Sequence, residues 1–207
     1  MNILTYLALG DSYTIGEAVH FQNNFPNQTV QLLRNRGLFI AAPEIIAKTG
    51  WTTCELMEAI NRWKFVPRYD FVSLLIGVNN QYRGLSIIDF RQELEQLIEK
   101  AIWLADNQTT RVAVLSIPDY SVTPFAENLD KNKISRELIE YNKINKELAF
   151  HYKLHYIDLQ STDNVESNRN FIAPDGLHPS EKLYNIWANK LSEVIFFQRH
   201  DSCQKAF

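Results

Sequence analysis

The sequence predicts a three-layer αβα sandwich, in which a parallel β-sheet lies between two layers of helices. Apolar, β-rich segments alternate with helical segments five times along the chain, which is the order that βαβ connections produce. Several apolar segments are nearly continuous, as expected for strands that are covered on both faces. No repeat or linker interrupts the 207 residues, so we expect one domain over residues 1–198. The polar tail at 199–207 is expected to be flexible.

Five segments have the composition of strands, because Ile, Leu, Val and aromatic residues dominate them. These segments are residues 3–9, 44–47, 71–76, 111–117 and 155–159. Five helical segments lie between and after them, near residues 25–36, 53–64, 87–105, 131–152 and 181–197. The segments 87–105 and 131–152 place apolar residues three and four positions apart, the spacing of an amphipathic helix. Gly37 lies where the first helix should stop.

The composition excludes several classes of protein. A hydrophobic fraction of 45% is ordinary for a globular domain and argues against disorder. The 21 basic and 24 acidic residues form no basic stripe, so no nucleic-acid partner is predicted. The apolar segments are shorter than the ~20 residues of a membrane helix, and no membrane span is predicted. The N-terminus lacks the features of a signal peptide, which predicts a cytoplasmic protein; export with a removed leader is the alternative.

Metal and disulfide sites are not expected. The two cysteines, Cys54 and Cys203, have no spacing typical of a zinc site or a disulfide framework, and Cys54 is expected to pack as a small apolar residue. His151 and His155 are four residues apart, but no glutamate follows the first, and the segment passes from helix into strand. Surface histidines explain this pair better than a metal site. We therefore predict neither a metal nor a cofactor.

Ser12 lies within Gly-Asp-Ser-Tyr, directly after the first predicted strand. Ligands of open parallel sheets bind beyond the carboxyl ends of the strands, where a serine hydroxyl would face them. Asp, Ser and Thr are also the residues that begin helices, and Thr14 with Glu17 has the spacing of a capping box. Taken alone, this motif is explained equally well by helix capping and by catalysis.

Asp175 and His178 supply what a nucleophilic serine needs. A serine hydroxyl reacts poorly until a base removes its proton, and a carboxylate on the other ring nitrogen holds the histidine in the required tautomer. Gly176 between them allows a tight turn that folds the carboxylate back onto the ring. An Asp-Gly turn before the last helix is the alternative for this segment. Together with Ser12, however, these residues form the parts of a hydrolytic triad in the order Ser, Asp, His.

Gly50 and the pair Gly77 and Asn79 follow the second and third predicted strands. A glycine allows a backbone N–H to approach a reacting oxyanion, and an asparagine amide adds a second donor. Glycines at strand ends usually only make turns. Together with Ser12 after the first strand, however, these positions make three sites at strand ends, which favours one common site.

These four blocks together resemble the SGNH hydrolases, also called the GDSL esterase/lipase family. The resemblance implies a flavodoxin-like sandwich with five parallel strands. It also implies that Ser12 is the nucleophile, that His178 is the base and that Asp175 orients it. The oxyanion hole would consist of the N–H groups of Ser12 and Gly50 and the side chain of Asn79.

Two positions depart from the family pattern. Tyr13 stands where the family motif has leucine, and Asn80 stands where its third block usually has a carboxylate. Neither change removes a reacting group. Both are expected to alter the residues that support the site and the substrate pocket.

The predicted function is hydrolysis of a small or medium acyl ester, with an acetylated carbohydrate as one candidate substrate. Asp11, Trp51, Tyr82, Arg83 and Tyr120 are expected to wall the pocket, the last within an aromatic loop after the fourth strand. An acyl-CoA thioesterase or a lysophospholipase could use the same residues. A catalytically inactive flavodoxin-like binding module is the alternative outside enzymes. The oligomeric state is not predicted.

Overall fold

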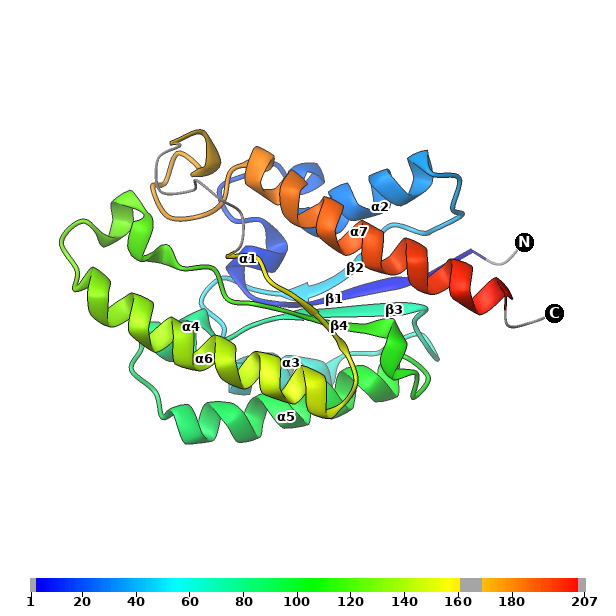
Figure 1. Ribbon diagram of the computed structural model, residues 1–207, viewed down its shortest axis with the longest axis horizontal. Coiled ribbons are helices and arrows are strands. Elements are labelled where there is room, and N and C mark those ends of the chain that lie inside the picture. Colours follow the sequence, from blue (N-terminus) through cyan, green and yellow to red (C-terminus); the bar gives the residue numbers. More distant parts are fainter. Residues whose placement is uncertain (1–2, 161–168, 205–207) are drawn as a thin grey trace.

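The computed structural model describes residues 3–160 and 169–204, and its centre is a five-stranded sheet (Figure 1). All pairings are parallel, in the order β2-β1-β3-β4-β5. This is the strand order of flavodoxin-like folds, and the predicted fold class is confirmed. The strands are β1 (Tyr6–Gly10), β2 (Glu44–Ala47), β3 (Phe71–Leu75), β4 (Val112–Leu115) and β5 (His155–Ile157).

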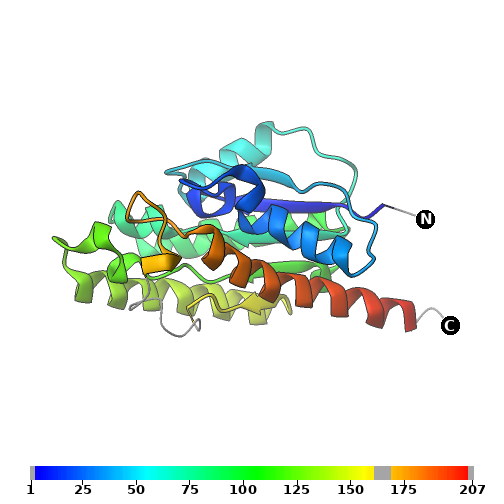
Figure 2. The same ribbon diagram turned by 90° about the horizontal axis from the view of Figure 1, so that it is seen from above.

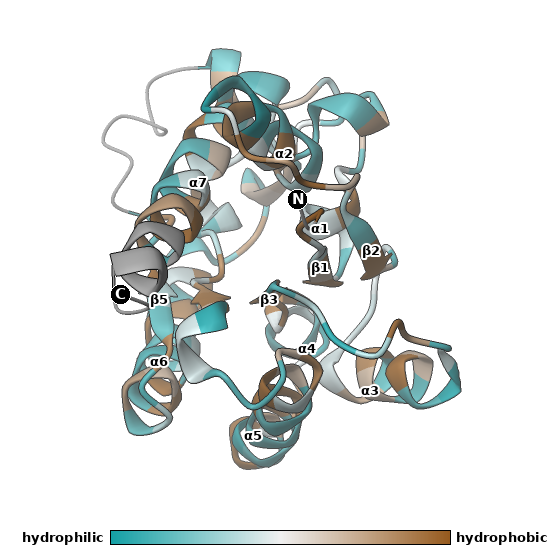
Figure 3. Cartoon of the chain, turned by 90° about the vertical axis from the view of Figure 1, so that its right-hand side faces the viewer, coloured by the Kyte–Doolittle hydropathy of each residue, from teal (hydrophilic) through white to brown (hydrophobic). Residues whose placement is uncertain are grey.

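Helices cover both faces of the sheet (Figures 1 and 3). On one face α2 (Phe25–Asn35) runs beside α7 (Glu181–Gln204), as Figure 2 also shows. On the other face lie α3 (Thr53–Arg62), α5 (Ile87–Leu104) and α6 (Lys131–His151). Two short helices, α1 (Ser12–Ile15) and α4 (Val78–Tyr82), directly follow the turns after β1 and β3. Short 3₁₀ turns occupy Phe21–Asn23, Thr109–Arg111, Tyr120–Val122, Pro124–Ala126 and Arg169–Phe171.

The five long helices agree with the sequence prediction, and the differences have local causes. The helices α1 and α4 were not predicted, because helices of four and five residues are too short to show a periodic pattern. The last helix continues to Gln204 instead of ending near residue 197. No glycine or proline occurs between residues 198 and 204, so nothing in the sequence stops the helix there.

The core fixes α7 against α2 through aromatic side chains. Trp187 is buried, and its ring lies 5.3 Å from Tyr184, 6.1 Å from Tyr13 and 6.3 Å from Phe25, centroid to centroid. Such edge-to-face contacts add to the free energy of burying the rings. The apolar sides of the helices turn toward the sheet (Figure 3). This packing connects the last helix to the segment that follows β1.

The sheet brings the ends of its first three strands to one edge. Gly10 is level with Ala47 of β2 and with Leu75 of β3. Because β2 and β3 lie on opposite sides of β1, the chain reverses its winding direction at β1. In open α/β sheets such a switch point is where ligands bind.

One prediction about a surface residue is wrong. Cys54 is exposed on α3 and does not pack as a small core residue. His151 ends α6 and His155 begins β5, where its Nε2 lies 2.9 Å from the Thr110 carbonyl oxygen. Within residues 3–160 and 169–204, no helix has the length and apolar character needed to cross a membrane.

Gly77, at the end of β3, provides a test of the packing. Its φ is 124°, and an added Cβ would lie 2.6 Å from Phe90 Cε2 and 2.8 Å from Ile117 Cδ1. Gly37 also has a positive φ, of 86°, but an added Cβ there would have no neighbour within 4 Å. Gly37→Ala should therefore lower the free energy of unfolding by about 1 kcal/mol, the cost of the backbone conformation alone. Gly77→Ala should lower it by about 3 kcal/mol, because overpacking is added. Urea unfolding of both variants checks this, and equal losses would contradict it.

Candidate active site

Ser12 is the first residue of α1, two positions beyond β1. The cap of this helix is Asp11, whose Oδ1 accepts a hydrogen bond from the Tyr13 N–H at 3.0 Å. Ser12 is therefore not needed as a cap. In the described part of the chain, neither its hydroxyl nor its N–H forms a hydrogen bond. Both groups are free for a ligand in the cavity that Ser12 lines.

A tight turn pairs Asp175 with His178. The Oδ2 of Asp175 lies 2.6 Å from Nδ1 of His178, while its Oδ1 accepts the N–H groups of Leu177 and His178 at 3.0 Å each. Gly176 allows the turn with a φ of 75°. Burial raises the pKa of Asp175, but the hydrogen bonds from the His178 ring and the two N–H groups outweigh it and leave the pKa lowered. The group is thus held as a carboxylate, and His178 Nδ1 carries the proton that it accepts.

The His178 ring is also fixed from the side of the core. Its centroid lies 5.8 Å from that of Tyr13, which packs edge-on and in turn contacts Trp187. Only 8% of His178 is exposed. Nδ1 is bonded to Asp175, while Nε2 has no hydrogen-bond partner within the described residues, and His178 lines the cavity.

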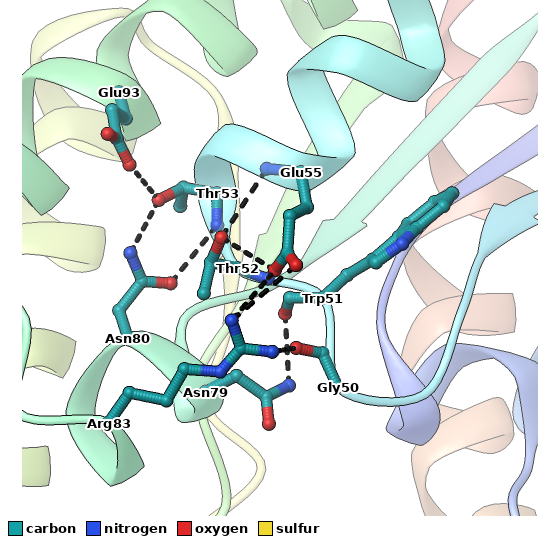
Figure 4. Close-up of polar contacts among 9 residues, drawn as sticks. All are labelled: Gly50, Trp51, Thr52, Thr53, Glu55, Asn79, Asn80, Arg83 and Glu93. Carbon is teal, nitrogen blue, oxygen red and sulfur yellow. Dashed lines mark hydrogen bonds and ion pairs between the residues drawn. The ribbon is translucent and has the colours of Figure 1, made fainter.

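Gly50 lies in a turn between β2 and α3, where the Trp51 N–H bonds to the Lys48 carbonyl at 3.2 Å. Its φ of 85° requires a glycine, and its N–H donates no hydrogen bond within the described residues. The Gly50 carbonyl accepts a hydrogen bond from the Arg83 guanidinium, as Figure 4 shows. Arg83 also forms an ion pair with Glu55 of α3 at 3.3 Å. The Arg83 contact holds the Gly50 carbonyl, which belongs to the peptide group between Gly50 and Trp51.

Asn79 comes from α4 and faces the same turn. Its Nδ2 donates to the Trp51 carbonyl oxygen at 2.9 Å (Figure 4). An amide nitrogen carries two hydrogens, so the other remains available to a ligand. Asn79 lines the cavity together with Gly50. The free N–H of Gly50 and the free hydrogen of Asn79 thus belong to groups that border one cavity.

The cavity has a volume of about 160 Å³. Three aromatic rings form one wall, those of Tyr82, Tyr120 and Phe125, with centroids 6.0–6.3 Å apart. The Tyr120 hydroxyl is held by Gln81 Oε1 at 2.9 Å. The full lining is Ser12, Tyr13, Thr49, Gly50, Val78, Asn79, Tyr82, Tyr120, Phe125, Leu177 and His178. The lining therefore combines the polar groups of Ser12, Gly50, Asn79 and His178 with mostly apolar side chains.

Not every residue expected at the site borders the cavity. Asp175 lies behind His178, Asp11 is buried beneath Ser12, and neither belongs to the lining. Trp51 packs its half-buried ring against the core, and Arg83 contacts the outer side of the Gly50 turn. The lining residues absent from the prediction are Tyr13, Thr49, Val78, Phe125 and Leu177. All but Phe125 adjoin a motif residue, and that proximity was the available signal. Phe125 lies in the same aromatic loop after the fourth strand as the predicted Tyr120.

Throughout the described residues, no group of three or more His, Cys, Asp or Glu side chains is arranged to hold a metal ion. The groups that line the cavity include the Ser12 hydroxyl, the His178 imidazole and the Asn79 amide, and Asp175 bonds to the imidazole from outside the lining.

The carboxyl group of Asp11 is an unusual buried acid. Only 1% of the residue is exposed, and Oδ2 has no hydrogen-bond partner within the described residues. Burial raises its pKa to about 7, despite the hydrogen bonds from the backbone N–H groups of Tyr13 and of Asp11 itself. The folded protein therefore holds a proton on Asp11 at pH values where the unfolded chain has released it.

The raised pKa of Asp11 predicts how the stability of the protein depends on pH. A raised folded-state pKa makes wild-type stability decline between about pH 4 and pH 7, because ionised Asp11 is costly to bury. Asp11→Asn keeps an oxygen for the helix cap and has no such ionisation. The free energy of unfolding of the variant, minus that of the wild type, should rise across this range and level off above it. Urea unfolding at several pH values measures the difference, and a constant difference would contradict the prediction.

Comparison with known proteins identifies a family. The profile of the GDSL-like lipase/acylhydrolase family matches residues 8–186. A sequence search of curated proteins finds no match.

Several solved structures share the fold. Axe2, an acetylxylan esterase from Geobacillus stearothermophilus, is 19% identical, with 94% of this chain and 96% of that chain covered and a TM-score of 0.73. A lipase/acylhydrolase from Enterococcus faecalis is 21% identical, with 93% and 95% covered and a TM-score of 0.73. TesA is 16% identical, with 94% and 99% covered and a TM-score of 0.74.

The family profile spans most of the chain and includes all four motif blocks that surround the cavity. The protein therefore belongs to the GDSL-like lipase/acylhydrolase family and is a hydrolase of carboxylic esters.

Proposed function

We propose that the chain is a serine esterase that cleaves small or medium acyl esters through an acyl-enzyme, with Ser12 as nucleophile and His178 as base. One observation carries the proposal. Asp175 binds Nδ1 of His178 at 2.6 Å, and the ring lines the same cavity as the unbonded Ser12 hydroxyl. Hydrogen bonds between nucleophile and base commonly tighten only when substrate is bound.

The first half of the reaction forms the acyl-enzyme. Nε2 of His178 takes the proton of Ser12 while Oγ forms a bond to the ester carbonyl carbon. The carbonyl oxygen becomes an oxyanion, and Asp175 stabilises the imidazolium. The intermediate then collapses, the C–O bond to the alcohol breaks, and the alcohol leaves with the proton from His178.

We expect three donors to stabilise the oxyanion. These are the N–H of Ser12, the N–H of Gly50 and the second hydrogen of the Asn79 amide. Loss of one such donor typically costs ~10²–10³ in rate, because the donors need no reorganisation during the reaction. Water then repeats the sequence on the acyl-enzyme, with His178 again as the base, and releases the acid and a regenerated Ser12.

The size of the cavity supports a short acyl group. A volume of about 160 Å³ is close to that of a cavity that holds one benzene molecule, about 150 Å³. The aromatic wall of Tyr82, Tyr120 and Phe125 offers apolar contact to such a group or to the alcohol part. An acetylated carbohydrate is a suitable candidate, and the fold neighbour Axe2 is an acetylxylan esterase.

A fluorophosphonate probe tests the reactive pair. The wild type should form a covalent adduct at Ser12, and Ser12→Ala should lose both the adduct and ester hydrolysis, since no activated nucleophile remains. Ser86→Ala is the matched control, because Ser86 caps α5 and does not line the cavity. Intact-mass spectrometry and peptide mapping measure the adduct. Labelling of Ser12→Ala at the wild-type rate would refute the assignment, and a wild type without adduct would favour an inactive binding module.

A series of p-nitrophenyl esters tests the substrate class. We expect kcat/KM to be highest for acyl groups of two to about four carbons, because longer chains exceed the cavity. A maximum at long chains would instead favour a lysophospholipase. Thioesters with the same acyl groups, measured in parallel, separate an oxyester hydrolase from an acyl-CoA thioesterase.

A further inference from the structure

Three polar side chains from three helices meet behind the Gly50 turn (Figure 4). Thr53 is the first residue of α3, Asn80 belongs to α4, and Glu93 belongs to α5. Thr53 and Asn80 are buried, with exposed fractions of 0% and 1%. None of the three lines the cavity, so none contacts a substrate there.

Each hydrogen bond among these three residues has a defined donor and a defined acceptor. The Thr53 N–H donates to Asn80 Oδ1 at 3.1 Å, and Asn80 Nδ2 donates to Thr53 Oγ1 at 2.6 Å. The Thr53 hydroxyl donates its own proton to Glu93 Oε2. A backbone N–H can only donate and a carboxylate can only accept, so the orientation of the Asn80 amide is determined at both ends.

This direction depends on an amide at position 80. An aspartate there could accept from the Thr53 N–H, but its second oxygen would face Thr53 Oγ1 without a hydrogen. The hydroxyl has one proton, which could not satisfy the aspartate and Glu93 together. Two carboxylates would also compete across one hydroxyl in a buried place, where unpaired charge is costly.

The same contacts determine the position of the Gly50 turn. Thr53 follows Gly50 and Trp51 in the chain, and the residue before Asn80 is Asn79, which binds the Trp51 carbonyl. Binding of Thr53 to Asn80 therefore sets how far the Gly50 N–H lies from the Asn79 amide. These are two of the three proposed oxyanion donors, and a displacement of about 1 Å in such a site can cost about 10²-fold in rate.

We propose that Asn80, Thr53 and Glu93 form a directional hydrogen-bond relay that positions the Gly50 turn against Asn79. The three are positioning residues, and their role rests on the proposed esterase function. The relay acts on the oxyanion hole and not on the aromatic wall of the cavity. Its disruption should therefore lower kcat and leave KM nearly unchanged.

The test exchanges the amide of position 80 and the carboxylate of position 93 between the two positions. Asn80→Asp should lower kcat about 10- to 100-fold, with KM changed less than about twofold. Glu93→Gln alone should cost only about threefold, because a glutamine oxygen still accepts the Thr53 proton but is a weaker acceptor than a carboxylate. In the double variant, the glutamine donates to Thr53 Oγ1 and the Thr53 proton turns to the new aspartate. The double variant should therefore recover kcat to within about fivefold of wild type, a clear departure from additivity.

Glu95→Gln is the matched control. Glu95 lies on the same helix but accepts a hydrogen bond from the hydroxyl of Tyr152, the residue after α6, at 3.0 Å. Combined with Asn80→Asp it removes the same negative charge without a contact to Thr53, so it should not restore kcat. Equal rescue by Glu95→Gln and Glu93→Gln, or additive losses in the Asn80→Asp/Glu93→Gln variant, would overturn the relay.

A second measurement separates the relay from the esterase function. Urea unfolding is measured for the wild type, Asn80→Asp, Glu93→Gln and the double variant. The free energies of unfolding should show the same non-additivity between positions 80 and 93, whatever the activity. A wild type inactive on every ester would overturn the proposed function and the catalytic role of the relay. Additive unfolding energies would overturn the hydrogen-bond exchange itself.

Discussion

The parallel pairing of β1 with both β2 and β3 determines where the candidate site residues that follow these strands can lie. Parallel strands end at the same edge, and each must then leave the sheet through a crossover. The first residues of three crossovers therefore meet: Ser12 after β1, Gly50 after β2 and Asn79 after β3. His178 precedes α7, and its ring contacts Tyr13, which in turn packs against Trp187 of α7.

The backbone acceptors near Gly50 have hydrogen-bond partners, whereas the Gly50 N–H has none within the described residues. The carbonyls of Gly50 and Trp51 are bound by Arg83 and Asn79, both from the segment that follows β3. Peptide groups that leave solvent need partners, and these carbonyls have them in Arg83 and Asn79. The Gly50 N–H donates no hydrogen bond within the described residues, and Gly50 lines the cavity. The neighbouring acceptors are thus satisfied by protein groups, while this donor is not.

The sequence was sufficient for features that depend on local spacing. Strand ends located Ser12 and Gly50, and the short separation of Asp175 and His178 foretold a turn that joins them. Arg83 shows where this reasoning stops: its contact with Gly50 depends on how α3 and α4 lie relative to each other, which periodicity does not specify. The exposure of Cys54 depends on the same rotation of α3. The helices α1 and α4 are too short to show a period, and the continuation of α7 has no stop signal to reveal its end.

The two members of the proposed reactive pair stand near opposite ends of the chain, which has a consequence for biosynthesis. A ribosome releases the N-terminal part first, so Ser12 emerges long before His178 and the helix that holds it in place. A serine without its base is an ordinary alcohol of low reactivity. Under the proposed mechanism, an incomplete chain would therefore carry no activated nucleophile, and hydrolysis would begin only after α7 has folded.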